Sequence, residues 1–187
     1  MNIAYLNILW IMFTLAGLII FGWVPSTIAL YATWRKIIKN KDRRVSVFGM
    51  FFKEYKNAFI QKNMAGLLMV LGGLLISFYL SFYQQTEGIF YIIYTGFIYI
   101  ICFLFINLLI YLPPVMVHFK LSFFQYFKQA LMISLSSPLT TLFFYTVTIL
   151  LVCIFYMFPS LILPFGFSTL PLIIMNGCLH RFKGLGF

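Results

Sequence analysis

The residue types that perform acid–base, nucleophilic or metal chemistry are scarce in this sequence and do not cluster. Its three carboxylates all lie outside the long apolar segments: Asp42, Glu54 and Glu87. No Ser/His/Asp set, HExxH motif, carboxylate pair or Gly-rich phosphate loop occurs. We therefore expect no enzymatic activity. A membrane enzyme acting on lipid or glycan stays open only if a partner supplies the general acid or base.

Cysteine and histidine show no ligand spacing either. Cys102, Cys153 and Cys178 each lie inside an apolar run, without a CxxC pair or a neighbouring cluster of His or carboxylates. We expect them to be small packing residues, with no disulfide, metal or cofactor. His118 and His180 end apolar runs beside basic residues, and we interpret them as interfacial residues.

Asn107 and Asn176 are the polar residues that we place deep in the apolar segments. Each could form a hydrogen bond to a substrate, or a packing contact between helices that contributes about 1 kcal/mol. We favour packing. The 24 phenylalanines and 12 tyrosines could line a sugar pathway, but lipid-facing and packing roles are the simpler interpretation.

The elements that carry these residues are membrane-spanning helices. The chain is 63% hydrophobic and 9% charged, with a mean hydropathy of +1.02, whereas soluble domains carry about 25% charged residues. Roughly 20 apolar residues cross a bilayer as a helix. We predict an all-α polytopic transmembrane helical bundle, one transmembrane domain over 1–187, with five spans at about 3–34, 64–83, 89–119, 139–158 and 160–179. We expect the first span to be retained, because no basic residue precedes Arg35 as a signal peptide would require.

Two of these spans, 3–34 and 89–119, are about ten residues longer than a crossing needs at about 1.5 Å per residue. Both carry proline near the C-terminal end, and proline removes a helical hydrogen bond. We expect a bend there. The candidates for helix kinks in the whole chain are Pro25, Pro113, Pro114, Pro164 and Pro171.

All thirteen Lys and Arg residues fall in loops on one side of the predicted membrane. The positive-inside rule then predicts an external N-terminus and a cytoplasmic C-terminus. The stretch "WRKIIKNKDRR" (34–44) is interpreted as the cytoplasmic anchor of the first span, beside anionic lipid, with Tyr31 and Trp34 in the aromatic belt. Topology thus accounts for the net charge of +10, and we expect no nucleic-acid partner.

Two amphipathic helices are predicted at the cytoplasmic interface, at about 46–62 and 121–136. Phe123, Phe127 and Lys128 occupy the second as Phe48, Phe52 and Lys53 occupy the first. The order of span, interfacial helix and span therefore occurs twice in the same direction. Two interpretations stay open: a parallel internal repeat, or two similar helices of independent origin.

The stretches "VPSTIALYATWRKI", "VFGMFFKEYKNAFIQKN" and "YLPPVMVHFKLSFFQYFKQALMISLSSP" give the chain a resemblance to the YesL-like family of small bacterial membrane proteins, a domain of unknown function, along nearly its whole length. The positions that match the family pattern are Pro25, Phe51, Phe52, Lys53, Tyr55, Lys56, Phe59 and Gln61. The sequence departs from that pattern on either side of Pro25, where Val24 and Ser26 replace the family's Gly and Ala. It departs again at Gly49-Met50, which replace an acidic approach to the paired phenylalanines.

The resemblance implies a protein typical of Gram-positive bacteria, whose genes often neighbour those of ABC-type oligosaccharide importers. We therefore expect a non-enzymatic accessory subunit that binds and stabilises or regulates such an importer, through its permease or ATPase. The candidate docking residues are Phe48, Phe51, Phe52, Lys53, Lys56, Phe123, Phe127 and Lys128. The alternative is a self-sufficient small-molecule transporter or channel that acts as an oligomer, with a pathway lined by the kinked spans.

Overall fold

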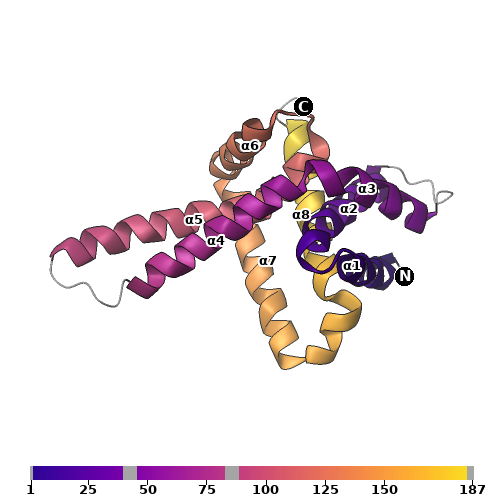
Figure 1. Ribbon diagram of the computed structural model, residues 1–187, viewed down its shortest axis with the longest axis horizontal. Coiled ribbons are helices and arrows are strands. Elements are labelled where there is room, and N and C mark those ends of the chain that lie inside the picture. Colours follow the sequence, from indigo (N-terminus) through magenta and orange to yellow (C-terminus); the bar gives the residue numbers. More distant parts are fainter. Residues whose placement is uncertain (1, 40–45, 83–88, 185–187) are drawn as a thin grey trace.

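The computed structural model describes residues 2–39, 46–82 and 89–184, and every element in these ranges is a helix (Figure 1). In chain order they are α1 (Asn2–Ala16), α2 (Ile20–Lys39), α3 (Val47–Gln61), α4 (Asn63–Phe82), α5 (Ile89–His118), α6 (Phe123–Ser136), α7 (Pro138–Met157), the 3-10 helix η2 (Pro159–Leu161) and α8 (Ile162–Gly184). The all-α prediction is confirmed. Some residues considered in the sequence lie outside the described part. They are the basic-loop residues Lys41, Asp42, Arg43 and Arg44, the carboxylate Glu87, and the side chains of Gln61 and Lys183.

Within the described residues, four helices are long and apolar enough to cross a bilayer: α4, α5, α7 and α8. Helix α1 is also apolar but shorter. The chain is therefore a multi-pass membrane protein, as predicted. The count of five spans and their direction across the membrane stay predictions.

The segment predicted as one long span over 3–34 is two helices, so that prediction is wrong. Leu18 and Ile19 adopt positive φ angles of 56° and 63° and end α1. The amide of Ile19 donates to the Thr14 carbonyl at 2.9 Å. Inside that bond, the amide of Leu18 donates to the Leu15 carbonyl at 3.0 Å. This nested pair is the Schellman arrangement that closes the C-terminus of a helix.

Two glycines let α1 and α2 pack backbone against backbone directly after this turn. A Cβ atom added at Gly17 would lie 2.3 Å from the Cα of Gly22. A Cβ atom added at Gly22 would lie 2.5 Å from the carbonyl oxygen of Thr14. No side chain fits in either place, so the glycines determine how closely the two helices approach.

The five prolines proposed as kink sites all lie within helices. Pro25 is inside α2, so the break in the first apolar segment precedes it. Pro113 and Pro114 are inside α5, which continues from Ile89 to His118. Pro171 is inside α8, and Pro164 lies in the first turn of that helix, where its missing amide removes no helical bond.

Two helical hairpins project from a central group of helices (Figure 1). Helices α4 and α5 lie side by side and form one hairpin. Helices α7 and α8, joined through η2, form the other, which points in a different direction. Helices α1, α2 and α3 pack together near the junction of the hairpins, where α1 and α2 also contact α8.

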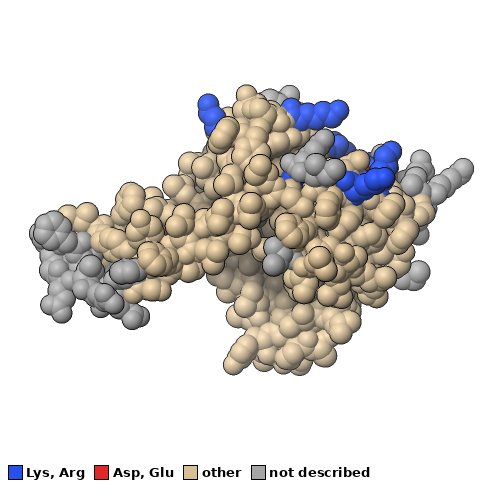
Figure 2. Space-filling view, viewed as in Figure 1, with Lys and Arg blue, Asp and Glu red and all other residues tan. Residues whose placement is uncertain are grey.

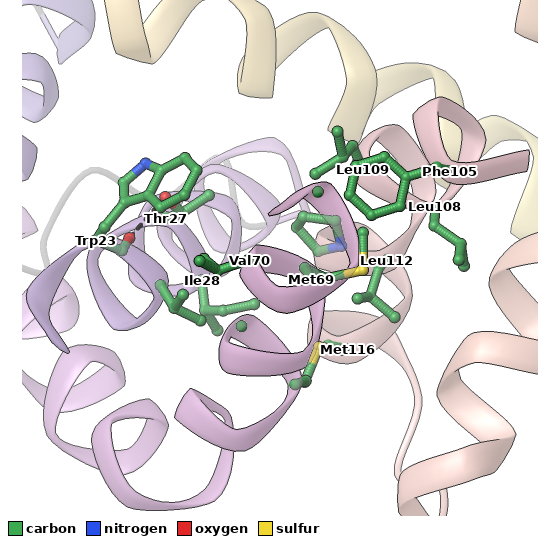
Figure 3. A pocket seen from close by; sticks show the side chains of 15 residues that line it. Trp23, Thr27, Ile28, Met69, Val70, Phe105, Leu108, Leu109, Leu112 and Met116 are labelled. Atoms are coloured by element: carbon green, nitrogen blue, oxygen red, sulfur yellow. Dashed lines mark hydrogen bonds between the residues drawn. The ribbon is translucent and has the colours of Figure 1, made fainter. Parts of the chain in front are cut away.

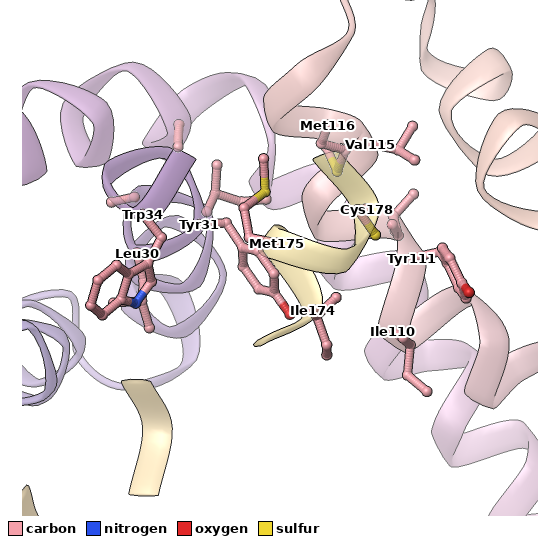
Figure 4. Packing of buried hydrophobic residues seen from close by; sticks show 14 of the residues in the cluster. Leu30, Tyr31, Trp34, Ile110, Tyr111, Val115, Met116, Ile174, Met175 and Cys178 are labelled. Atoms are coloured by element: carbon pink, nitrogen blue, oxygen red, sulfur yellow. The ribbon is translucent and has the colours of Figure 1, made fainter. Parts of the chain in front are cut away.

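The core lies where α8 packs between α2 and α5 (Figure 4). Tyr31 and Trp34 of α2 are each only 4% exposed and belong to this core. Their predicted place in a lipid-facing aromatic belt is therefore wrong. The reason is tertiary: α3 and α8 both pack on α2 and cover these rings. From α5, Tyr111 and Val115 complete the core on the other side of α8.

Asn7 of α1 connects the first helix to the last. Its side chain is fully buried, and its amide nitrogen donates to the Leu163 carbonyl at 2.5 Å. Its amide oxygen accepts from the Phe167 amide at 2.8 Å. These two backbone groups are four residues apart, the spacing of helical hydrogen bonds. Trp10 stacks on Phe167 at a centroid distance of 4.1 Å and reinforces the junction.

The described basic residues gather at one end of the molecule, which we call the basic end. Figure 2 shows the Lys and Arg side chains along the upper rim, over α3, α6 and the C-terminal part of α8. In this view the projecting ends of the two hairpins carry none. The structure thus places cations from distant parts of the sequence together, as the topological interpretation requires.

Candidate functional site

Helix α3 carries the first group of predicted docking residues on the outside of the basic end. Ser46 caps its N-terminus by accepting a hydrogen bond from the Gly49 amide at 3.0 Å. Its inner face packs mainly on α2. Phe51 is fully buried on that face, so this docking candidate is a core residue. Phe48 and Phe52 are 47% and 49% exposed and remain accessible.

Phe13 of α1 packs against the accessible rings of α3. The Phe13 ring lies 6.0 Å from that of Phe48 and 5.9 Å from that of Phe52, between centroids. The rings of Phe48 and Phe52 are stacked, with an interplanar angle of 2°. The Tyr55 hydroxyl donates to the Phe13 carbonyl at 3.1 Å and ties α3 to the end of α1. A preformed aromatic pair of this kind binds a partner at a lower entropy cost than free side chains.

Lys53 and Lys56 flank this aromatic pair and are exposed. Lys36 of α2 pairs with Glu54 of α3, with 2.7 Å between Nζ and Oε1. Both partners are partly exposed, so the pair contributes at most about 1 kcal/mol. The outer face of α3 therefore presents two phenyl rings and two lysines that form no ion pair with any described residue. We call Phe48, Phe52, Lys53 and Lys56 the α3 patch.

Helix α6 carries the second group. Phe123 and Phe127 are half-buried, with ring centroids 5.5 Å apart, and Lys128 is exposed. Phe124, which the sequence did not single out, is 80% exposed and is the most accessible ring on this helix. It lies at a position between the two matched phenylalanines, so the comparison with α3 drew no attention to it.

The structure does not bring the two predicted docking groups into one surface. Helix α3 packs mainly on α2, which precedes it, and α6 packs mainly on α5, which precedes it (Figure 1). Each makes a smaller contact with the helix that follows. This equivalent placement is what an internal repeat would produce, although independent helices could share it.

Two cations at the basic end have a structural role that the sequence did not reveal. The Lys62 ammonium donates to the Met116 carbonyl at 2.7 Å. The Arg35 guanidinium donates to the next carbonyl, that of Val117. Both acceptors belong to the last turn of α5, where carbonyls lack helical partners and the helix dipole favours positive charge. Burial lowers the pKa of Lys62, and the nearby carboxylate of Glu54 offsets part of this effect by raising the pKa.

Two pairs of polar residues form hydrogen bonds between helices inside the bundle. Asn107 is fully buried and accepts a hydrogen bond from the Ser134 hydroxyl at 2.8 Å. Tyr111 and Thr141 share a buried hydrogen bond of 2.8 Å. These contacts join α5 to α6 and α7, in keeping with the packing interpretation. Asn176 is exposed on α8 and takes no part in them.

A cavity of about 340 Å³ lies between α2, α4 and α5 (Figure 3). Its lining is almost entirely apolar, from Trp23 and Ile28 on one side to Phe105 and Leu109 on the other. Within the described residues, no group of three or more His, Cys, Asp or Glu side chains could hold a metal ion. In the part of the chain that the structure describes, neither the cavity nor the basic end offers an arrangement of acid, base and nucleophile.

Comparison with known proteins gives a family but no activity. The family model described as "Protein of unknown function, DUF624" matches residues 3–80. No solved structure matches the chain.

Three proteins of Bacillus subtilis (strain 168) are similar along most of the chain. The "Uncharacterized protein YteU" is 34% identical over 170 residues, which are 91% of this chain and 76% of that protein. The "Uncharacterized protein YesV" is 32% identical over 183 residues, 97% and 87% of the two chains. The "Uncharacterized protein YesL" is 28% identical over 187 residues, 99% and 87%. These similarities confirm the resemblance seen in the motifs, and the chain belongs to the YesL-like DUF624 family.

Proposed function

We propose that this protein is a non-enzymatic accessory subunit of the bacterial plasma membrane that binds and stabilises or regulates an ABC-type oligosaccharide importer. The importer is the partner that the family resemblance implies. The observation that supports a binding role is the α3 patch, a fixed pair of half-exposed phenyl rings beside two exposed lysines. Aromatic residues are enriched at the centres of protein interfaces, whereas charged residues such as lysine lie at the polar rim and steer the approach of a partner.

The proposal includes an orientation. The basic end faces the cytoplasm and the C-terminal end of α8 lies there, because positively charged loops are retained on that side. The α3 patch and the exposed face of α6 then lie at the cytoplasmic surface of the membrane. An importer's permease reaches this surface with its cytoplasmic loops, and its ATPase docks against the same loops. A partner surface that combines an apolar groove with carboxylates would complement the α3 patch.

The test is co-purification from the native membrane. The full chain, tagged at its C-terminus, is extracted in mild detergent and the proteins recovered with it are identified by mass spectrometry. We expect an importer permease and its ATPase in stoichiometric amounts. The variant Phe48→Ala/Phe52→Ala should lose at least about tenfold of this recovery, since interface aromatics each contribute about 2 kcal/mol or more when they are hot spots.

The matched control is Tyr156→Ala, which removes an aromatic ring that is 87% exposed on α7, away from the α3 patch. It should leave the recovery unchanged. Equal recovery with the α3 double variant, at equal membrane insertion, would show that the α3 patch does not bind the importer. A chain that purifies without any importer subunit, yet transports solute in liposomes that contain it alone, would replace this proposal with the transporter alternative.

A further inference from the structure

The cavity between α2, α4 and α5 accepts an apolar occupant. Its volume of about 340 Å³ falls in the range of ligand sites, about 300–1,000 Å³. Thr27 is one of the few polar side chains in the lining, and its hydroxyl already donates to the Trp23 carbonyl at 2.8 Å. The same oxygen accepts from the Trp10 indole at 3.2 Å. The cavity therefore has almost no free polar group with which to bind a sugar or an ion.

The length of the cavity matches one leaflet of a bilayer. Its lining runs from Ala65 to Gly73 on α4 and from Phe105 to Met116 on α5. At a rise of about 1.5 Å per residue, these stretches are about 12 and 17 Å long. The hydrocarbon core is about 30 Å thick, so one leaflet is roughly 15 Å. Both stretches lie in the halves of α4 and α5 nearest the basic end, so the cavity spans the leaflet on that side.

Arg35 and Lys62 lie where this cavity meets the basic end. Lys62 precedes Ala65 by less than one turn, and it donates to the carbonyl of Met116, which also lines the cavity. Arg35 follows the lining residue Ile28 by seven positions, which places both on one face of α2. Figure 3 shows Met116 at one end of the cavity and Trp23 on a part of the lining far from that end.

Neither of these two cations forms an ion pair with a carboxylate of the described residues, although Glu54 lies near enough to act on the pKa of Lys62. Among the described residues the ion pair that forms at the basic end is Lys36 with Glu54, and neither Arg35 nor Lys62 joins it. Both side chains are partly buried, and a partly buried charge is costly without a counter-ion. Each uses a carbonyl for part of its donor capacity and has N–H groups left, because an ammonium has three and a guanidinium five.

We propose that this cavity binds one acyl chain of an anionic phospholipid, whose phosphate is held by Arg35 and Lys62. The apolar lining favours an acyl chain, and the length of the cavity matches a chain that crosses one leaflet. The two cations favour an anionic headgroup. This site is independent of the importer, because the α3 patch shares no residue with it.

Native mass spectrometry of the purified full-length protein tests the proposal. The probes are phosphatidylglycerol and phosphatidylcholine with identical acyl chains, added to delipidated protein. We expect one phosphatidylglycerol to be retained about thirtyfold more tightly, since two cations near a membrane phosphate each contribute about a factor of five. Equal retention of the two lipids would overturn the assignment of the headgroup to these cations.

Two variants separate the chain from the headgroup. Gly73→Leu fills the cavity: its Cβ would meet the Phe105 ring at an ordinary 3.6 Å, so the helix itself tolerates the change. It should abolish retention of both lipids. Gly96→Leu is the matched control, because its Cβ has no atom within 4 Å, and it should bind as the wild type does. Arg35→Gln/Lys62→Gln should bind both lipids equally, since glutamine still donates to the α5 carbonyls but carries no charge.

Retention of phosphatidylglycerol by a folded Gly73→Leu protein would overturn the acyl-chain site. So would an unchanged lipid preference in the Arg35→Gln/Lys62→Gln variant. A third refuting outcome is a change from dimer to monomer in Gly73→Leu without loss of lipid, because it would assign the cavity to a second copy of this chain. Circular dichroism and gel filtration verify the fold of each variant.

Discussion

The close approach of α1 and α2 predicts that Gly22→Ala destabilises the protein. An alanine Cβ at position 22 would lie 2.5 Å from the Thr14 carbonyl oxygen and 2.9 Å from the Cα of Gly17. Ordinary contacts begin at 3.4 Å, so the helices must separate by roughly 0.9 Å, and overpacking of this kind costs about 1–3 kcal/mol. Gly22 is helical and its φ lies outside the left-handed region, so alanine gains up to about 1 kcal/mol in helix propensity. The expected net loss is about 1–2 kcal/mol.

Equilibrium unfolding in mixed detergent and SDS micelles, followed by tryptophan fluorescence, measures this loss. Trp10 and Trp23 lie on the two helices concerned and report on their separation. Gly96→Ala is the matched control: its Cβ would have no atom within 4 Å, so its free energy of unfolding should stay within about 0.5 kcal/mol of the wild type. If Gly22→Ala unfolds at the same SDS fraction as Gly96→Ala, the backbone contact does not limit the hairpin and the argument fails.

Three further predictions test other parts of the structure. Leu18→Gly should raise the free energy of unfolding by about 1 kcal/mol in the same assay, because Leu18 is 79% exposed and its φ of 56° favours glycine; a loss of stability would contradict the Schellman turn. A double-mutant cycle of Tyr111→Phe and Thr141→Val should give a coupling energy of about 0.6 kcal/mol, typical of hydrogen bonds between membrane helices, and a value of zero would contradict the bond seen at 2.8 Å. A membrane-permeant maleimide should label Cys153, which is exposed, and spare Cys178, which is 1% exposed; single-cysteine proteins measured by mass shift decide this, and equal labelling would contradict the core.

The elements that the sequence predicted well are those whose signal is local. The predicted span 64–83 corresponds to α4 (Asn63–Phe82), and the predicted interfacial helix 46–62 corresponds to α3 (Val47–Gln61). An uninterrupted apolar run and phenylalanines at helical spacing depend only on neighbouring residues. Their boundaries therefore do not require knowledge of the fold.

The failures concern contacts between distant segments. The usual signal for the end of a helix is glycine at the left-handed position, but here Leu18 occupies it and Gly17 precedes it. Pro25 was the conspicuous breaker, yet α2 contains it. Tyr31 was expected to face lipid because nothing in its neighbourhood announces that α3 and α8 cover α2.

The docking candidates show the same division. Spacing alone identified Phe48 and Phe52 as one face of α3, and the structure leaves both accessible. Spacing could not distinguish these two residues from Phe51, which packs in the core against Phe13 with 5.3 Å between the ring centroids. Asn7 carries the same signal in the sequence as Asn107, an amide within an apolar run.

The bond between Asn7 and α8 has a consequence for biogenesis. Its acceptor and donor, the Leu163 carbonyl and the Phe167 amide, are synthesised more than 150 residues after it. A ribosome that adds about 5–20 residues per second needs roughly 8–30 seconds for that interval. During this time the side chain of Asn7 lacks its final partners, and α1 cannot take its native place. Assembly of this protein is therefore completed by its last helix, and a chain interrupted before Ile162 should expose an unsatisfied amide to membrane quality control.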